Sequence, residues 1–213
     1  SQPSQLSVLD IPIPKPQAVE EGSVEYHLIN SEEKFLTFLI SLKKQRVFAF
    51  DTEATSLDTW TGQLVGIGFS WKEKEAFFIP RKKSWLGALK PFFEDSKIKK
   101  VGQNLKFDIE ILLSEHIQVA GPLFDTMVAS YLINPGTRQH SLDTLAFTEF
   151  GYQMQPIEDL IGKKGKNQKC MADVPIQSVS DYCCEDVDFT LRLVKPLTKQ
   201  LRESNNVGLF EKM

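Results

Sequence analysis

Two acidic residues, Asp51 and Glu53, end the apolar run in the segment RVFAFDTE. On a β-strand, residues i and i+2 point to the same face, so the two carboxylates are expected to project together at the end of this strand. An ionised carboxylate in an apolar setting is strongly unfavourable unless a partner neutralises it. A metal ion would be such a partner, and this pair would supply half of its site. An ordinary turn after the strand is the alternative, since Asp and Thr are common there.

A second set of polar residues opens the helix predicted in QNLKFDIE. Asn104 and Asp108 are four residues apart and are therefore expected to share a helix face. Ile111 and Leu112 flank that face, which places Asp108 towards the buried side. A solvated first turn is the alternative, because the helix dipole favours acidic residues near an N-terminus.

A third set lies in SDYCCEDVDFTLRL, where Tyr182 and Asp186 are again four residues apart. Val187, Leu191 and Val194 predict the inward side of this helix, so the phenol and the carboxylate are expected at the edge of a core. The alternative is a charged helix face made of Asp181, Glu185, Asp186 and Asp188.

The three motifs DxE, NxxFD and YxxxD occur in this order, and together they resemble the motifs of the DEDDy 3′-5′ exonucleases. Within that group, several segments are similar to the proofreading domain of bacterial DNA polymerase I: DTEATSLDTWTGQLVGIGFS, VGQNLKFDIEIL, FDTMVASYLI, HSLDTLA, GKKGKNQ and YCCEDVDFTLRL. The resemblance extends from about residue 24 to the C-terminus. It implies an α/β protein of ribonuclease H-like fold, with a central mixed β-sheet flanked by helices.

The resemblance also implies a catalytic set. Asp51, Glu53, Asp108 and Asp186 would be the ligands of two divalent ions, with Asp51 bridging both, Glu53 and Asp186 completing the first site and Asp108 serving the second. Oxygen ligands without a His or Cys cluster suit Mg²⁺ or Mn²⁺ and disfavour zinc. Two such ions generate the attacking hydroxide and stabilise the leaving oxygen. Tyr182 is implied to orient the attacking water together with Glu53.

Substrate contacts are implied for residues outside this set. Asn104 and Leu57 would touch the terminal nucleotides, with Leu57 as an apolar wedge between bases, although an ordinary loop hydrophobe is equally compatible with Leu57. The lysines of GKKGKNQK, which are Lys163, Lys164, Lys166 and Lys169, are candidates for phosphate contacts. A solvated loop is the usual meaning of such a run.

The bulk composition limits the alternatives. The chain of 213 residues has 25 basic and 28 acidic residues, hence a net charge of −3, so any binding of nucleic acid must rest on a local surface. Its three cysteines provide no disulfide framework and match no zinc motif, which favours a reduced, cytoplasmic protein. The adjacent Cys183 and Cys184 are interpreted as small packing residues of a helix. No apolar run approaches the length of a membrane span.

Residues 1–22 contain four prolines and are expected to form a linker or arm, and residues 23–213 the exonuclease domain. The first residue is Ser1, and we expect the chain to be a fragment of a longer protein. The periodicity predicts strands over 24–29, 46–51, 63–71, 75–80 and 99–103, and helices over 32–44, 85–95, 104–115, 124–133, 141–150 and 178–201. Ser31, Asp125 and Ser141 are expected to cap helices.

The sequence therefore predicts a metal-dependent exonuclease that releases nucleoside monophosphates from the 3′ end of single-stranded DNA. We expect it to be the proofreading part of a DNA polymerase I, with a polymerase domain in the same parent chain, no membrane partner and a monomeric isolated fragment. An exoribonuclease related to ribonuclease D uses the same motifs and is one alternative. A catalytically silent domain is another, and loss of a carboxylate would indicate it; all four acids and the tyrosine are present.

Overall fold

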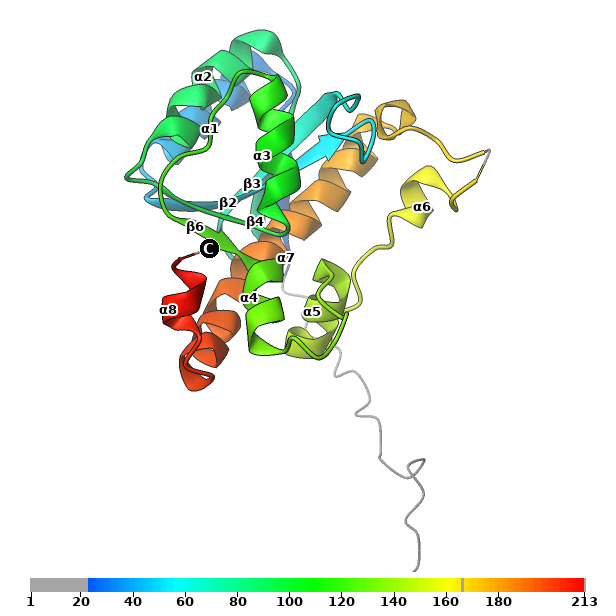
Figure 1. The fold of residues 1–213 in the computed structure, drawn as a ribbon. Helices are drawn as coiled ribbons and strands as arrows, with labels where there is room; N and C mark the ends of the chain where they lie inside the picture. Colours follow the sequence, from blue (N-terminus) through cyan, green and yellow to red (C-terminus); the bar gives the residue numbers. More distant parts are fainter. Residues whose placement is uncertain (1–22, 166, 213) are drawn as a thin grey trace, which may run out of the picture.

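A mixed six-stranded sheet forms the centre of the computed structural model, which describes residues 23–165 and 167–212 (Figure 1). The strands are β1 (Glu25–Leu28), β2 (Val47–Ala54), β3 (Leu64–Lys72), β4 (Glu75–Pro80), β5 (Lys99–Gly102) and β6 (Leu123–Asp125), in the spatial order β1-β4-β3-β2-β5-β6. β3 is antiparallel to both β2 and β4, and the other neighbours are parallel. The predicted α/β class and mixed sheet are thus confirmed, whereas the predicted linker over residues 1–22 lies outside the described residues.

Helices cover both faces of this sheet (Figure 1). They are α1 (Glu32–Leu42), α2 (Lys83–Glu94), α3 (Leu105–Ser114), α4 (Thr126–Ile133), α5 (Leu142–Phe150), α6 (Glu158–Ile161), α7 (Ile176–Glu203) and α8 (Val207–Phe210), with a short 3₁₀ turn at Met171–Asp173. The first three helices share one apolar core with the sheet, and α7 runs across the opposite face. None of the helices in the described part of the chain is both long enough and apolar enough to cross a membrane.

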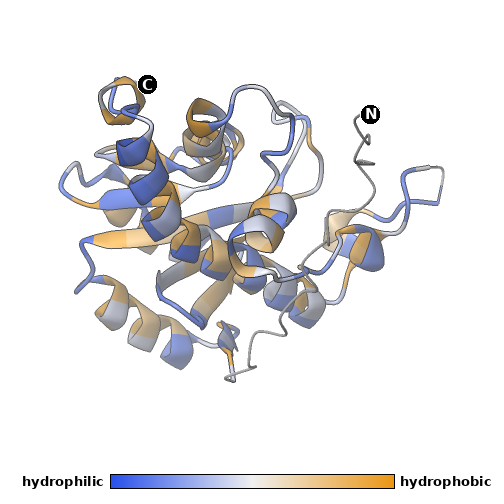
Figure 2. Ribbon diagram, turned by 90° about the horizontal axis from the view of Figure 1, so that it is seen from below, coloured by the Kyte–Doolittle hydropathy of each residue, from blue (hydrophilic) through white to orange (hydrophobic). Residues whose placement is uncertain are grey.

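The alternation of β2 decides where its acids point. Phe48 and Phe50 are fully buried in the core shared with α1 and α2, whereas Ala49 is buried in the core beneath α7. Side chains two residues apart share a face, so Asp51 and Glu53 follow Ala49 onto the α7 side. Figure 2 shows the hydrophobic colouring of the central strands, in contrast to the mixed colouring of the surrounding helices.

Some boundaries differ from those predicted. β2 continues to Ala54, so both acids lie within the strand rather than at its end, because the antiparallel pairing with β3 reaches that far. The segment predicted as one helix over 124–133 divides into the end of β6 and α4, and α6 and α8 were not predicted. An apolar stretch as short as that of β6 gives too little periodicity to separate a strand from a helix.

The three predicted caps precede their helices, and two of them cap as expected. The Ser31 hydroxyl accepts a hydrogen bond from the Lys34 N–H, and the Asp125 carboxylate accepts from the first turn of α4. Ser141 stands at the start of α5 but makes no capping hydrogen bond to the backbone, since its hydroxyl pairs with that of Thr144.

Candidate active site

The part of β2 that carries Asp51 and Glu53 extends beyond its pairing with β5. β5 pairs with β2 only over residues 47–49, so the later residues of β2 have no strand partner on that side. The start of α3 occupies this gap. There the Thr52 N–H and hydroxyl both donate to the Asp108 Oδ1 atom, at 2.8 Å and 2.6 Å. A main-chain donor that would otherwise lack a strand partner thus fixes the Asp108 carboxylate beside the acids of β2.

The opposite strand provides room for α7. Gly68 pairs with Asp51 and Gly66 with Glu53 across the β2–β3 ladder. A Cβ atom on Gly68 would lie 2.7 Å from the Cys183 Sγ atom and 2.9 Å from the Val187 Cγ1 atom, closer than such atoms approach in practice. The absence of a side chain therefore lets α7 pack directly against β3.

This close packing brings the third motif over the acids. Tyr182 and Asp186 lie one turn apart on α7 and line the same cavity, of about 600 Å³, as Asp51, Glu53 and Asp108. All five residues predicted as catalytic therefore meet in one hollow. Its remaining lining residues are Thr52, Ala54, Thr55, Ser56, Leu57, Gln103, Asn104, Phe107, Ile157, Ile161, Gln168, Lys169 and Met171.

Desolvation makes the four carboxyl groups unusually weak acids. Desolvation raises the pKa of Asp51 from its ordinary value of 3.8 to about 6. Desolvation, followed by the negative charge of Asp51, raises the pKa values of Glu53, Asp108 and Asp186 well above their usual range. None of the four takes part in an ion pair within the described residues. Glu53 and Asp108 are buried and Asp51 and Asp186 are half-buried. Four such acids without a cationic partner, all with oxygen donors, suit a hard divalent cation.

The predicted substrate-contact residues divide into two groups. Leu57 and Asn104 line the cavity, whereas Lys163 and Lys164 are exposed residues outside its lining. Lys166 lies outside the described residues. Lys169, the last lysine of the predicted GKKGKNQK run, does line the cavity.

Asn104 reaches the cavity by a different route from the one predicted. It does not share a helical face with Asp108, because α3 begins at Leu105 and Asn104 precedes it in the left-handed conformation, with φ of 58°. The Asp125 carboxylate accepts hydrogen bonds from the N–H groups of Asn104 and Leu105, at 3.1 Å and 2.7 Å, and so holds this turn. The helix cap of α4 thereby also positions the start of α3.

We also did not predict the roles of Thr52, Gly66 and Gly68, or the position of Cys183 beside Asp51. The Cys183 thiol is buried as a packing residue should be, but it also donates to the Asp51 Oδ2 atom across 3.7 Å. The spacing GIG in β3 matches the spacing DTE in β2, and mid-strand glycines signal a close approach. That signal was available in the sequence.

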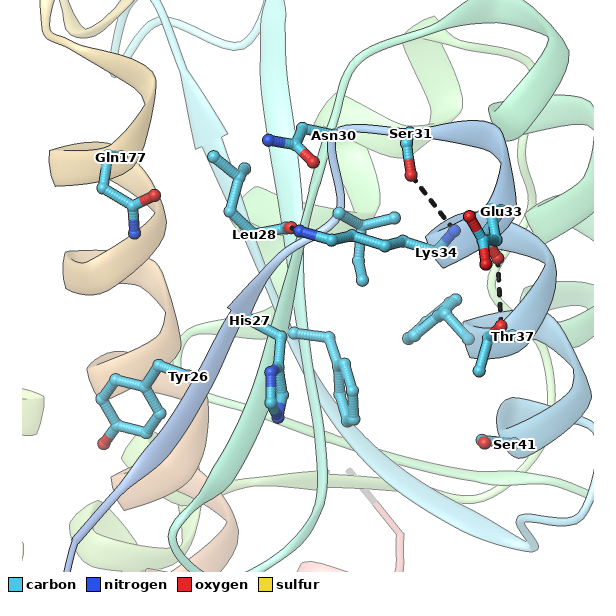
Figure 3. A pocket seen from close by; sticks show the side chains of 13 residues that line it. Tyr26, His27, Leu28, Asn30, Ser31, Glu33, Lys34, Thr37, Ser41 and Gln177 are labelled. Carbon is cyan, nitrogen blue, oxygen red and sulfur yellow. Dashed lines mark hydrogen bonds between the residues drawn. The ribbon is translucent and has the colours of Figure 1, made fainter.

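A second cavity and a second cluster of possible metal ligands are weaker candidates for a functional site. A cavity of about 660 Å³ lies between β1, α1 and the start of α7, where Lys34 reaches towards the Leu28 carbonyl group (Figure 3). Its only acidic lining residue is Glu33, so it lacks a carboxylate pair. Glu25, His27 and Glu75 form a second possible ligand cluster, but it is largely exposed and Glu75 already pairs with Lys72.

A six-stranded mixed sheet with carboxylates gathered between β2, α3 and α7 defines a nuclease-type domain of ribonuclease H-like fold. Among solved structures, Escherichia coli RNase D, an exoribonuclease involved in structured RNA processing, has a TM-score of 0.68 at 17% identity over 88% of this chain and 48% of its own. Brucella melitensis NrnC with bound Mg²⁺ has a TM-score of 0.68 at 19% identity over 89% and 87%. These likenesses concern the fold.

The family follows from the sequence comparison. The model of the 3′-5′ exonuclease family matches residues 26–202, and the chain belongs to this family. DNA polymerase I of Pseudomonas aeruginosa is 35% identical over 195 residues, which cover 85% of this chain. The chain spans 21% of the length of that relative.

Proposed function

We propose that this domain hydrolyses the terminal phosphodiester at the 3′ end of single-stranded DNA and releases nucleoside monophosphates, with the help of two Mg²⁺ or Mn²⁺ ions. The observation that carries the proposal is the meeting of four buried or half-buried carboxylates and Tyr182 in one cavity, without an ion-pair partner among the described residues. Family membership and the DNA polymerase I relatives support the choice of reaction and of DNA.

The carboxylates would hold the ions. Asp51 would serve both, Glu53 and Asp186 the first, and Asp108 the second, partly through water. Divalent ions held there would lower the pKa of a bound water and stabilise the departing 3′ oxygen. Two such ions would also neutralise the four carboxylates, which without them would repel the negatively charged phosphate.

Tyr182 would act by orientation. Its pKa is raised by burial and, next, by the negative charge of Asp186 and Glu53, so its hydroxyl stays protonated at neutral pH. A protonated phenol cannot serve as the base, but it can hold a water molecule in line with the scissile phosphate, with Glu53 as the second partner.

The rim would receive the strand. Leu57 is 90% exposed beside the cavity, where an apolar side chain can insert between the last two bases. Asn104, at the start of α3, supplies an exposed amide in the lining of the same cavity. Lys169 in the cavity, and Lys163, Lys164 and Lys166 in the loop before it, would contact phosphates.

The biological setting belongs to the same proposal. The relatives are DNA polymerases, so we infer that the domain acts beside a polymerase domain in one parent chain and removes misincorporated nucleotides during replication and repair. The isolated domain is proposed to be a monomer.

The test is digestion of matched 5′-labelled DNA and RNA single strands with Mg²⁺, Mn²⁺ or EDTA. We expect a ladder that shortens from the 3′ end with DNA and a divalent ion, and no cleavage in EDTA. Equal or faster shortening of RNA would favour a ribonuclease D-like activity. Absence of cleavage of both would favour a catalytically silent domain.

A further inference from the structure

The loop between β2 and β3 carries two of the most exposed apolar side chains in the described part of the protein. Trp60 is 96% exposed and Leu57 is 90% exposed, whereas no other large hydrophobic residue in that part exceeds 62%. Leu57 has a place in the proposed reaction as a wedge at the cavity. Trp60 has no such place in the reaction. It also has no structural role, because an indole so exposed contributes almost nothing to the core.

Hydrogen bonds hold this loop in a defined shape. The Asp58 carboxylate accepts from the Trp60 N–H at 3.1 Å and from the Thr61 hydroxyl at 3.0 Å, and the Gly62 N–H donates to the Asp58 carbonyl at 2.7 Å. A Cβ atom on Gly62 would lie 2.9 Å from that same carbonyl oxygen, so the turn needs glycine there. The exposed indole is therefore presented on an ordered turn.

The turn is also fixed relative to the acidic cavity. It follows Glu53 by only a few residues, and its Ser56 and Leu57 line the cavity. On its far side the Thr59 hydroxyl donates to Glu110 of α3 at 2.8 Å, on the helix that carries Asp108. In Figure 1 the loop lies, in cyan, above the sheet close to α3 and the beginning of α7.

We propose that Trp60 is a stacking surface for a base of the single strand whose 3′ end occupies the acidic cavity. This inference rests on the proposed function and extends it to a further substrate-binding residue. A strand that leaves the cavity past Leu57 meets the next residues of the same loop, and an indole face binds any base without regard to sequence. With a net charge of −3 the domain has no general attraction for DNA, so stacking contributes a correspondingly larger share of binding.

Tryptophan fluorescence should detect the contact between Trp60 and a base directly. Trp71 is half-buried and Trp85 is 5% exposed, so Trp60 is the only fully exposed one of the three tryptophans of the chain. Titration with an oligothymidylate that carries 3′ phosphorothioate linkages, in Mg²⁺, should quench the tryptophan fluorescence of the parent protein. The Trp60→Phe variant should lose this quenching while it still binds the oligonucleotide.

Affinity and cleavage then separate stacking from chemistry. Trp60→Ala should raise Kd and KM by about 5-fold to 100-fold, the range for loss of one base–aromatic stack, and leave kcat near the parent value. Trp60→Phe should recover most of the affinity. Ile40→Ala, which removes an exposed apolar side chain from α1, is the matched control and should behave as the parent does.

A small substrate separates this inference from the proposed function. Thymidine 5′-p-nitrophenyl phosphate has no neighbouring base, so the parent and Trp60→Ala should hydrolyse it equally with Mn²⁺. If the parent cleaves it and the oligonucleotide, but Trp60→Ala binds and cleaves DNA as the parent does, the stacking inference is wrong and the proposed function stands. If the parent cleaves neither substrate, the proposed function fails. Concentration-dependent self-association that disappears in Trp60→Ala, with DNA binding unchanged, would also overturn the inference and assign the indole to a protein contact.

Discussion

Tyr182 and Asp186 share one side of α7, yet we assign them different work. Asp186→Ala removes a proposed metal ligand and should abolish nearly all cleavage. Tyr182→Phe keeps the ring and all four carboxylates and loses one oriented hydrogen bond, so cleavage should slow by about 10²-fold to 10³-fold with metal affinity near that of the parent. Manganese titration followed by single-turnover cleavage measures both on the same samples. Equal losses of metal binding in the two variants would refute the division of roles.

Thr52 has a role that its position between two acids hides in the sequence. Its hydroxyl and N–H hold the same oxygen of the buried Asp108 carboxylate. Thr52→Val keeps the branched shape and removes only the hydroxyl donor, and we expect it to lower the free energy of unfolding by about 1 to 3 kcal/mol, as for a lost bond to a charged group. Thr52→Ser restores the donor and should recover most of that loss. Urea unfolding of the three proteins in saturating Mg²⁺ provides the comparison, and an unaffected Thr52→Val would show that the backbone donor alone positions Asp108.

At the scale of the elements, the contact of α7 with β3 controls the site. Gly68→Ala places a methyl group against Cys183 and Val187, and overpacking of this kind costs about 1 to 3 kcal/mol. Because α7 must move to make room, Tyr182 and Asp186 should also leave the acids of β2, so Mn²⁺ affinity should fall together with stability.

Gly87→Ala is the matched control for that prediction. Gly87 lies in α2, where an added Cβ atom would meet nothing within 4 Å, so the change should be neutral or slightly stabilising. Isothermal titration with Mn²⁺ and thermal melts distinguish the two alanine variants. Parent-like metal binding in Gly68→Ala would mean that α7 adjusts without loss of the site.

The same elements show how much of the fold and of the site could be predicted from the sequence. The apolar run before Asp51 predicted β2, and helical spacing predicted the longer helices, because each of those patterns repeats over enough residues to be distinctive. The five residues that the motifs predicted as catalytic all line the same cavity. The left-handed turn at Asn104 was not predictable, since it depends on Asp125, which is distant in sequence. The fit of Cys183 against Gly68 likewise joins two elements that only the fold brings together.

For the molecule as a whole, the carboxylate cluster should make the pH dependence of stability differ with and without metal. In the metal-free protein, the folded state keeps protons that the unfolded chain has already released, because the pKa of Asp51 is about 6 and the other three are raised well above their usual range. The contribution to stability is complete below about pH 4 and is lost as the pH rises through 6 and beyond. For Asp51 alone this loss is on the order of 3 kcal/mol, from a rise in pKa from 3.8 to about 6.

Bound divalent ions would act in the opposite sense on the free energy of unfolding. They bind the ionised carboxylates, so their affinity rises with pH, and a ligand specific for the folded state adds about 2.7 kcal/mol at a hundred times its Kd. Urea unfolding between about pH 5 and pH 8 should therefore show a stability that falls with pH in EDTA and falls less, or rises, in Mg²⁺. Asp51→Asn removes one titrating group and the charge that raises its neighbours' pKa values, so its EDTA slope should be shallower than that of the parent. Identical slopes in EDTA and Mg²⁺ would contradict the assignment of this cluster as the metal site. They would mean that a bound cation does not change how the free energy of unfolding depends on the ionisation of these acids.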